Sequence, residues 1–150
     1  MDKLVVITIA LCISFVLSVK NNEEALDHNG ISITSLQNFC YNETGFTKEQ
    51  HKLIRDTRAY SSNMNYFCYV GCYCTHFKDL LLFTRVLNYG SVMASITRSN
   101  SISKANQVMN QCKKITTNSL CAAGREIHDC FAQNGVAIEG LIGYFDGGKM

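Results

Sequence analysis

Cysteine is the residue type whose number and spacing say most about the chemistry of this 150-residue chain, which contains eight cysteines and no proline or tryptophan. Cys68 and Cys72 are four residues apart, so on a helix they project from one face and can each reach a different neighbouring segment. Cys121 and Cys130 are nine residues apart and fall on opposite faces of a helix, so we expect them to bond to different partners. Once oxidised, such cysteines can cross-link a helical protein through several of its helix faces.

The number of cysteines in the mature protein depends on a predicted signal peptide at residues 1–18. A charged start precedes an apolar run from Leu4 to Leu17, which at about 14 residues is shorter than a bilayer-spanning helix. We expect cleavage before Val19 and a secreted, extracellular product of residues 19–150, with no stable insertion in a membrane; a retained anchor is the alternative. Cys12 then leaves, so seven cysteines remain and at least one stays unpaired within a monomer.

Helical patterns position these cysteines. Alternating apolar–polar stretches are short, whereas apolar residues recur at helical spacing along most of the mature chain. Thr47 and Gln50 fit a capping box, and Asn134-Gly135 fits a left-handed helix end. The sequence therefore predicts one all-α domain, a compact bundle of about six helices. The predicted helices, with a short turn at Ser91–Ile96 between the third and fourth, are Ser35–Cys40, Thr47–Tyr60, Met64–Leu87, Ile102–Cys112, Leu120–Phe131 and Ala137–Phe145.

Composition excludes several classes of protein. The 14 basic and 12 acidic side chains give a formal charge of +2, too small for the clustered basic face of a protein that binds nucleic acid or anionic membranes. Hydrophobic residues make up 47% of the chain, which excludes a disordered tail protein. We therefore expect no nucleic-acid partner.

The spacing of six cysteines resembles the signature of the insect odorant-binding proteins, the pheromone- and general-odorant-binding family. The spacers of three and eight residues are the diagnostic ones in Cys40-x27-Cys68-x3-Cys72-x39-Cys112-x8-Cys121-x8-Cys130. The resemblance implies six helices around an apolar cavity, held by three disulfides, Cys40–Cys72, Cys68–Cys121 and Cys112–Cys130. Cys74 departs from this pattern. It lies about 200° around the helix from Cys72, which makes it the expected odd thiol, and a disulfide-linked homodimer or a different pairing stays open.

The resemblance also implies binding without catalysis or cofactor: a secreted carrier of a small hydrophobic ligand such as an odorant or pheromone. The alternative is a protein on the same scaffold that acts through a protein partner, such as a chemoreceptor, or as a Cys74-linked dimer. Met93 and Met109 are favoured as ligand contacts because methionine adapts to varied shapes. Each candidate has ordinary core packing as its alternative. The candidate ligand contacts are Phe77, Leu81, Phe83, Leu87, Met93, Ile96, Met109, Phe131, Ile142 and Phe145.

Two further features carry predictions. Among the four histidines, His76 is the one we favour for a pH-dependent release of ligand, with a solvated helix face as the alternative. Asn42-Glu-Thr44 is an N-glycosylation sequon in a predicted loop, unless Asn42 is only a turn residue.

Metal and enzyme alternatives are disfavoured. Cys68, Cys72, Cys74 and His76 offer four zinc ligands, but secreted thiols usually oxidise and no second ligand pair follows at zinc-finger spacing. His128-Asp129 resembles the active-site pair of secreted phospholipases A2, but the glycines of the calcium loop and the paired cysteines before the histidine are missing. We expect no metal and no catalytic residue.

Overall fold

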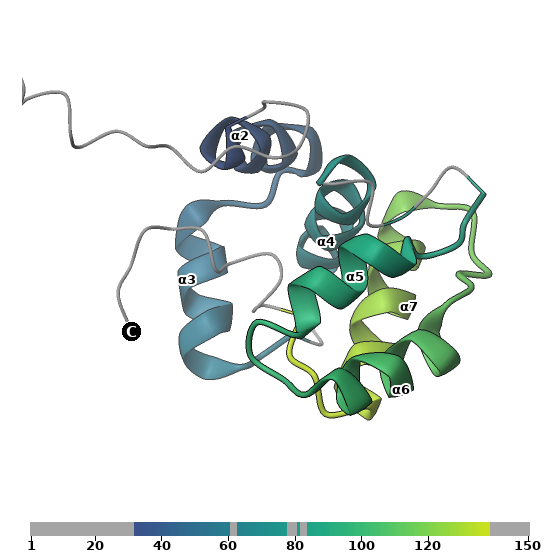
Figure 1. The fold of residues 1–150 in the computed structure, drawn as a ribbon. Coiled ribbons are helices and arrows are strands. Elements are labelled where there is room, and N and C mark those ends of the chain that lie inside the picture. Colours follow the sequence, from purple (N-terminus) through teal and green to yellow (C-terminus); the bar gives the residue numbers. More distant parts are fainter. Residues whose placement is uncertain (1–31, 61–62, 78–80, 82–83, 139–150) are drawn as a thin grey trace, which may run out of the picture.

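The computed structural model describes residues 32–60, 63–77, 81 and 84–138 (Figure 1). These residues contain helices and no strand, in agreement with the predicted all-α bundle. The signal peptide and most of the predicted helix Ala137–Phe145 lie outside the described residues. The helices are α2 (Ile33–Thr44), α3 (Lys48–Thr57), α4 (Met64–His76), α5 (Tyr89–Ile96), α6 (Ile102–Cys112) and α7 (Leu120–Gln133).

Helix α4 is the centre of the molecule, with α2 and α3 on one side and α5, α6 and α7 on the other (Figure 1). Nine consecutive residues of this helix, 66–74, are buried, so its whole circumference is covered by other segments. A helix that is apolar on every side is typical of the middle of a fold rather than of its surface. The sequence from Tyr66 to Cys74, with its three tyrosines, therefore forms the core.

Helices α4 and α7 cross closely because a glycine stands on each at the crossing. A Cβ atom on Gly124 would overlap the carbonyl oxygen of Phe67 and the backbone nitrogen of Gly71. A Cβ atom on Gly71 would overlap the carbonyl oxygen of Leu120. Glycine lets two backbones approach in this way because it has no side chain to hold them apart.

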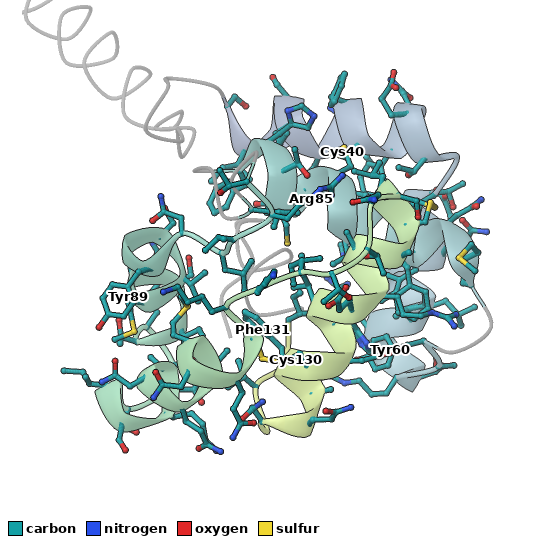
Figure 2. All side chains as sticks on the ribbon, turned by 90° about the vertical axis from the view of Figure 1, so that its right-hand side faces the viewer. Cys40, Tyr60, Arg85, Tyr89, Cys130 and Phe131 are labelled. Atoms are coloured by element: carbon teal, nitrogen blue, oxygen red, sulfur yellow. A yellow bond between two sulfur atoms is a disulfide. The ribbon has the colours of Figure 1, made fainter. Side chains whose placement is uncertain are left out.

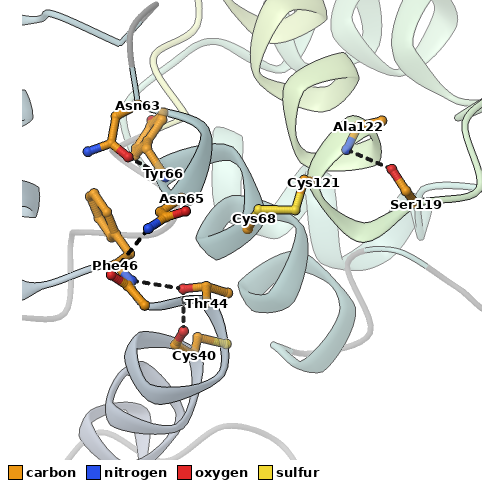
Figure 3. Close-up of a disulfide and its surroundings, with 11 residues drawn as sticks. Cys40, Thr44, Phe46, Asn63, Asn65, Tyr66, Cys68, Ser119, Cys121 and Ala122 are labelled. Atoms are coloured by element: carbon orange, nitrogen blue, oxygen red, sulfur yellow. Dashed lines mark hydrogen bonds between the residues drawn. A yellow bond between two sulfur atoms is a disulfide. The ribbon is translucent and has the colours of Figure 1, made fainter.

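Three disulfides join the helices in the pairs that the family resemblance implies. Cys68–Cys121 links α4 to α7 (Figure 3). Cys40–Cys72 links α2 to α4, and Cys112–Cys130 links α6 to α7. Every helix that carries a disulfide is thus tied, directly or through one neighbour, to the α4–α7 pair.

The helix ends follow the local signals in the sequence. Thr47 accepts from the backbone N–H of Gln50 while the Gln50 side chain accepts from the N–H of Thr47, which confirms the capping box of α3. Helix α7 ends at Gln133 and is followed by the cap Asn134 and by Gly135, whose φ of 68° is left-handed. The N–H groups of Gly135 and Val136 donate to the carbonyls of Ala132 and Phe131, a Schellman end that confirms the predicted cap.

The predicted continuation of the third helix from Lys78 to Leu87 is wrong at the residues that the structure describes there, 81 and 84–87; residues 78–80, 82 and 83 lie outside the described part of the chain. Helix α4 ends at His76, and Phe77 is already extended at φ −86° and ψ 110°. The N–H of Leu81 donates to the carbonyl of Cys74, and the N–H of Leu87 donates to the carbonyl of Lys113, both at 2.8 Å. The apolar spacing is helical, but backbone bonds to the last turn of α4 at Leu81, and to the segment after α6 at Leu87, take the place of helical ones.

Two further predictions need correction. Helix α5 begins at Tyr89, with Asn88 as the cap that accepts from the N–H of Ser91, so the predicted short turn at Ser91–Ile96 is part of a helix that begins two residues earlier. Helix α2 extends past Cys40 to Thr44 and ends at the left-handed Gly45. Asn42 therefore lies in the last turn of a helix, with an exposed side chain, and not in a loop.

Glu126 of α7 holds the connection between α6 and α7. Its carboxylate accepts hydrogen bonds from the backbone N–H and the hydroxyl of both Thr116 and Thr117, at 2.9–3.1 Å. Partial burial alone would raise the pKa of Glu126, but these donated hydrogen bonds outweigh it and hold the pKa below its usual value. The ionised carboxylate is therefore part of the fold.

Candidate ligand-binding site

Seven of the ten candidate ligand contacts belong to or pack against the hydrophobic core of the described residues, which also includes side chains of α2, α3 and the middle of α4. The six that are fully buried, each at most 4% exposed, come from the end of α4, the connection after it, α5, α6 and α7. Met93 of α5 is partly buried and packs against the same core. We call these seven residues the apolar cluster: Phe77, Leu81, Leu87, Met93, Ile96, Met109 and Phe131. Phe83, Ile142 and Phe145 lie outside the described residues.

The backbone of the connection after α4 positions two members of the cluster. Leu81 and Leu87 face each other in an isolated antiparallel bridge, and Val86 forms a second bridge with Lys114. The N–H of Ile115 donates to the carbonyl of Arg85, which has a left-handed φ of 60°. These contacts hold the connection against the end of α6.

The chemistry of the apolar cluster is burial of apolar surface. Every member is an aliphatic, aromatic or thioether side chain, so the cluster offers no group for acid–base or nucleophilic catalysis. Figure 2 shows Phe131 near the centre of the view, with Tyr89 to its left and Tyr60 to its right. An apolar molecule placed among such residues gains roughly 25 cal/mol for each Å² removed from water.

A polar groove lies between α2 and α3, away from the apolar cluster. Its volume is about 210 Å³. Tyr41 and His51 connect the two helices across it, with 2.6 Å between the phenol oxygen and Nδ1. Sequence patterns do not reveal this groove, because its two walls become neighbours only through the turn between the helices. The lining residues are Thr34, Gln37, Tyr41, Lys48, His51, Lys52 and Arg55.

A second hollow lies over α4 and α7. The Tyr60 ring packs at a tilt of 54° against the His128 ring, at a centroid distance of 4.9 Å, and the Arg125 guanidinium lies 4.5 Å above the Phe67 ring. The hollow has two adjoining parts of about 320 and 300 Å³ that share Arg58, Tyr60 and His128. Neither part, nor the groove between α2 and α3, is lined by a member of the apolar cluster.

The structure places the rings of His76 and His128 against aromatic side chains. His76, the predicted pH sensor, lies at the end of α4 and packs edge-on against Phe39 at 5.3 Å, so it does not belong to the apolar cluster. His128 is 8% exposed, and its Nδ1 lies 2.9 Å from a carboxylate oxygen of Asp129. The rings of Tyr60, Tyr66 and Phe67 surround it.

Cys74 is the free cysteine among the described residues, as the helical geometry predicts. It is 2% exposed, and burial raises the pKa of its thiol to about 12. At neutral pH the group is therefore a protonated thiol rather than a reactive thiolate. A Cys74-linked dimer would require the packing around the last turn of α4 to open, so the structure disfavours that form of the alternative function.

The oxidation of two of its cysteines argues against the zinc site that was the alternative for this segment. Cys68 and Cys72 are both in disulfides, which removes two of the four proposed sulfur and nitrogen donors. Within the described part of residues 32–138, no group of three or more potential metal ligands gathers at one point. In the same part of the chain, no helix is long and apolar enough to cross a membrane.

Comparisons with known proteins agree with the helices and disulfides. The PBP/GOBP family model matches residues 22–134, which include all six paired cysteines. No curated protein matches the chain. Among solved structures, the chain is similar to a fatty acid binding protein, OBP56a, from the oral disk of the blowfly Phormia regina, with a TM-score of 0.55 and 17% sequence identity over 76% of this chain and 97% of that one.

That structural likeness, at this level of identity, shows a shared fold. The family match covers most of the chain, and proteins of this family bind and carry small ligands and are not known as enzymes. On the cysteine pattern, the six helices, the three disulfides and the family model together, the chain belongs to the PBP/GOBP family.

Proposed function

We propose that this protein is a secreted carrier that holds a small apolar molecule in its apolar cluster and moves it through aqueous fluid. The observation that carries the proposal is the convergence of Phe77, Leu81, Leu87, Met109 and Phe131 from separate segments into one buried cluster of a chain that belongs to a ligand-binding family. Phe83, Ile142 and Phe145 extend the proposed site beyond the described residues.

Fatty acids are one class of ligand to test. The similar blowfly protein is named as a fatty acid binding protein. A saturated chain matches an apolar cluster, and the polar end of such a molecule would stay near water because no charged side chain belongs to the cluster. Odorants and pheromones of similar polarity are the other class that the proposal covers.

Secretion is part of the proposal. The three disulfides are of the kind that form in oxidising compartments, and the predicted signal peptide at residues 1–18 provides the route. Expression of the full chain in insect cells should release a product that begins at Val19, as measured by intact mass. A retained, uncleaved chain in the membrane fraction would contradict secretion without touching the ligand site.

Displacement of a fluorescent apolar probe tests the ligand site. N-phenyl-1-naphthylamine should bind the wild-type protein and be displaced by palmitate or by an apolar alcohol. Met109→Trp, which fills space inside the cluster, should weaken probe binding about tenfold. Leu53→Trp is the matched control, because Leu53 is 61% exposed on α3, and it should bind as the wild type does.

Because Met109→Trp can also destabilise the core, Met93→Trp at the partly buried edge of the cluster provides a second test. Circular dichroism and thermal unfolding confirm that each variant is folded before binding is compared. If the probe does not bind the wild type, or if both cluster variants bind as the control does, the proposed site is wrong.

A further inference from the structure

The groove between α2 and α3 has two chemically different walls. On α2, Thr34, Gln37 and Tyr41 are spaced at three and four residues, so they follow one face of the helix. The wall from α3 is a row of cations at the same spacing, Lys48, Lys52 and Arg55, with His51 beside them. The 2.6 Å contact between Tyr41 and His51 fixes the distance between the walls.

Gln37 is the feature of the groove that points to a ligand. Its side chain is 8% exposed and lines the groove, yet it makes no hydrogen bond to any described residue. The polar atoms of the Gln37 side chain are not fully buried, so the amide is open to the space of the groove and can reach a molecule held there. The amide carries two N–H donors that an acceptor inside the groove would satisfy.

The charge of the groove selects the kind of acceptor. Three cationic side chains line it, and none of its described lining residues is a carboxylate. Glu49 and Asp56 are on α3 but do not line the groove, and Asp56 lies 3.8 Å from Nε of Arg55, a long ion pair. Ammonium and guanidinium groups beside an amide donor favour an oxyanion, because hydrogen bonds to a charged oxygen are stronger than neutral ones.

The size of the groove limits how much of a ligand it can take. Pockets for whole drug-sized molecules range from about 300 to 1,000 Å³, and this groove has about 210 Å³. It therefore suits a single anionic group rather than a complete lipophilic ligand.

We propose that the α2–α3 groove is a second binding site, separate from the apolar cluster, that holds one oxyanion, a carboxylate or a phosphate group, between Gln37 and the cations of α3. The anion is either free in solution or the head of an amphiphile. This site does not depend on the apolar cluster, since the two share no residue.

An NMR titration of the isotope-labelled mature protein tests the site. The readout is the side-chain amide signal of Gln37, assigned by its loss in Gln37→Met. Inorganic phosphate, octanoate and 1-octanol are added at constant ionic strength and neutral pH. We expect saturable shifts with phosphate, octanoate or both, and none with octanol. Phosphate alone would identify a free anion, octanoate alone the head of an amphiphile, and both a site that takes either.

Matched charge variants complete the test. Lys52→Gln should weaken anion binding about fivefold, whereas Lys113→Gln, an exposed lysine just after α6, should leave it unchanged. The proposal is overturned if neither anion shifts the Gln37 signal, if octanol shifts it as strongly as octanoate, or if the two lysine variants bind alike. Probe binding in the apolar cluster is measured on the same samples and should be unaffected.

Discussion

The α4–α7 pair and the α2–α3 pair differ in how they are held together. Helix α4 is buried over nine consecutive residues, crosses α7 at two glycines and is joined to it by Cys68–Cys121. Helix α3 has one buried side chain, Ile54, and carries no disulfide. Between α2 and α3 lies a polar groove instead of a packed seam.

This difference indicates that the two pairs of helices have different roles. The α4–α7 pair contributes most of the free energy of unfolding, because buried apolar surface and disulfides are concentrated there. The α2–α3 pair has fewer packing constraints, so the side chains that line its groove can carry charge and recognise polar groups. Each variant below either sharpens this comparison or breaks it.

Loss of the Cys68–Cys121 disulfide should have the largest effect. The bond closes a separation of 53 residues, so the double variant Cys68→Ala/Cys121→Ala should lose about 4 kcal/mol of unfolding free energy in the chain-entropy description. Cys112→Ala/Cys130→Ala, which opens a separation of 18 residues, should lose about 3 kcal/mol. Chemical denaturation measures both; the reverse order would show that loop closure does not set the stability of the α4–α7 pair.

A methyl group at the helix crossing should have the next largest effect. Gly124→Ala places a Cβ atom against the backbone of α4, so we expect a loss of about 3 kcal/mol as the two helices move apart. Gly90→Ala in α5 is the control, because only the Asn88 side chain lies near its added Cβ, at 3.5 Å. The control should change the free energy of unfolding by about 1 kcal/mol or less. Equal effects would mean that the crossing is not tightly packed.

Glu126→Gln should have a smaller, pH-dependent effect. The variant should lose about 1 kcal/mol near neutral pH, a figure kept low because the carboxylate is partly exposed to solvent. The folded pKa of Glu126 is lowered from 4.5, so its contribution is present above that pH and is lost as the pH falls through the folded value. Unfolding curves of the wild type and the variant should therefore converge in acid. A constant gap between them would contradict this role.

The smallest effect is expected on α3. Leu53 is 61% exposed, so Leu53→Ser should change the free energy of unfolding by less than about 0.5 kcal/mol. Thermal unfolding beside the wild type measures it. A large loss would show that α3 is packed as firmly as α7, and the comparison between the two pairs would fail.

Local signals in the sequence predicted much of the fold. The capping box at Thr47 and Gln50 and the helix end at Gly135 depend only on nearby residues, so they are readable from a short stretch of chain. The disulfide pairs came from the family resemblance, because spacing alone leaves several pairings open. The structure contains those same pairs.

Features that depend on distant segments were not predictable in this way. The residues from Leu81 to Leu87 have helical apolar spacing, but hydrogen bonds to residues near Lys113 outweigh it. The crossing of Gly71 and Gly124 joins positions that are far apart in the sequence. The basic row on α3 is visible in the sequence, whereas the Gln37 side chain opposite it, mostly covered but lining the groove, is placed there only once α2 and α3 are folded together.

Native mass spectrometry of the secreted protein, before and after denaturation and with labelling of free thiols, tests the central claim most directly. We predict a monomer with three internal disulfides that carries a small apolar molecule, lost on denaturation. Cys74 should be labelled only after unfolding, because it is buried and protonated in the folded state. A covalent dimer with no bound molecule, and no uptake from a panel of apolar ligands, would contradict the carrier function.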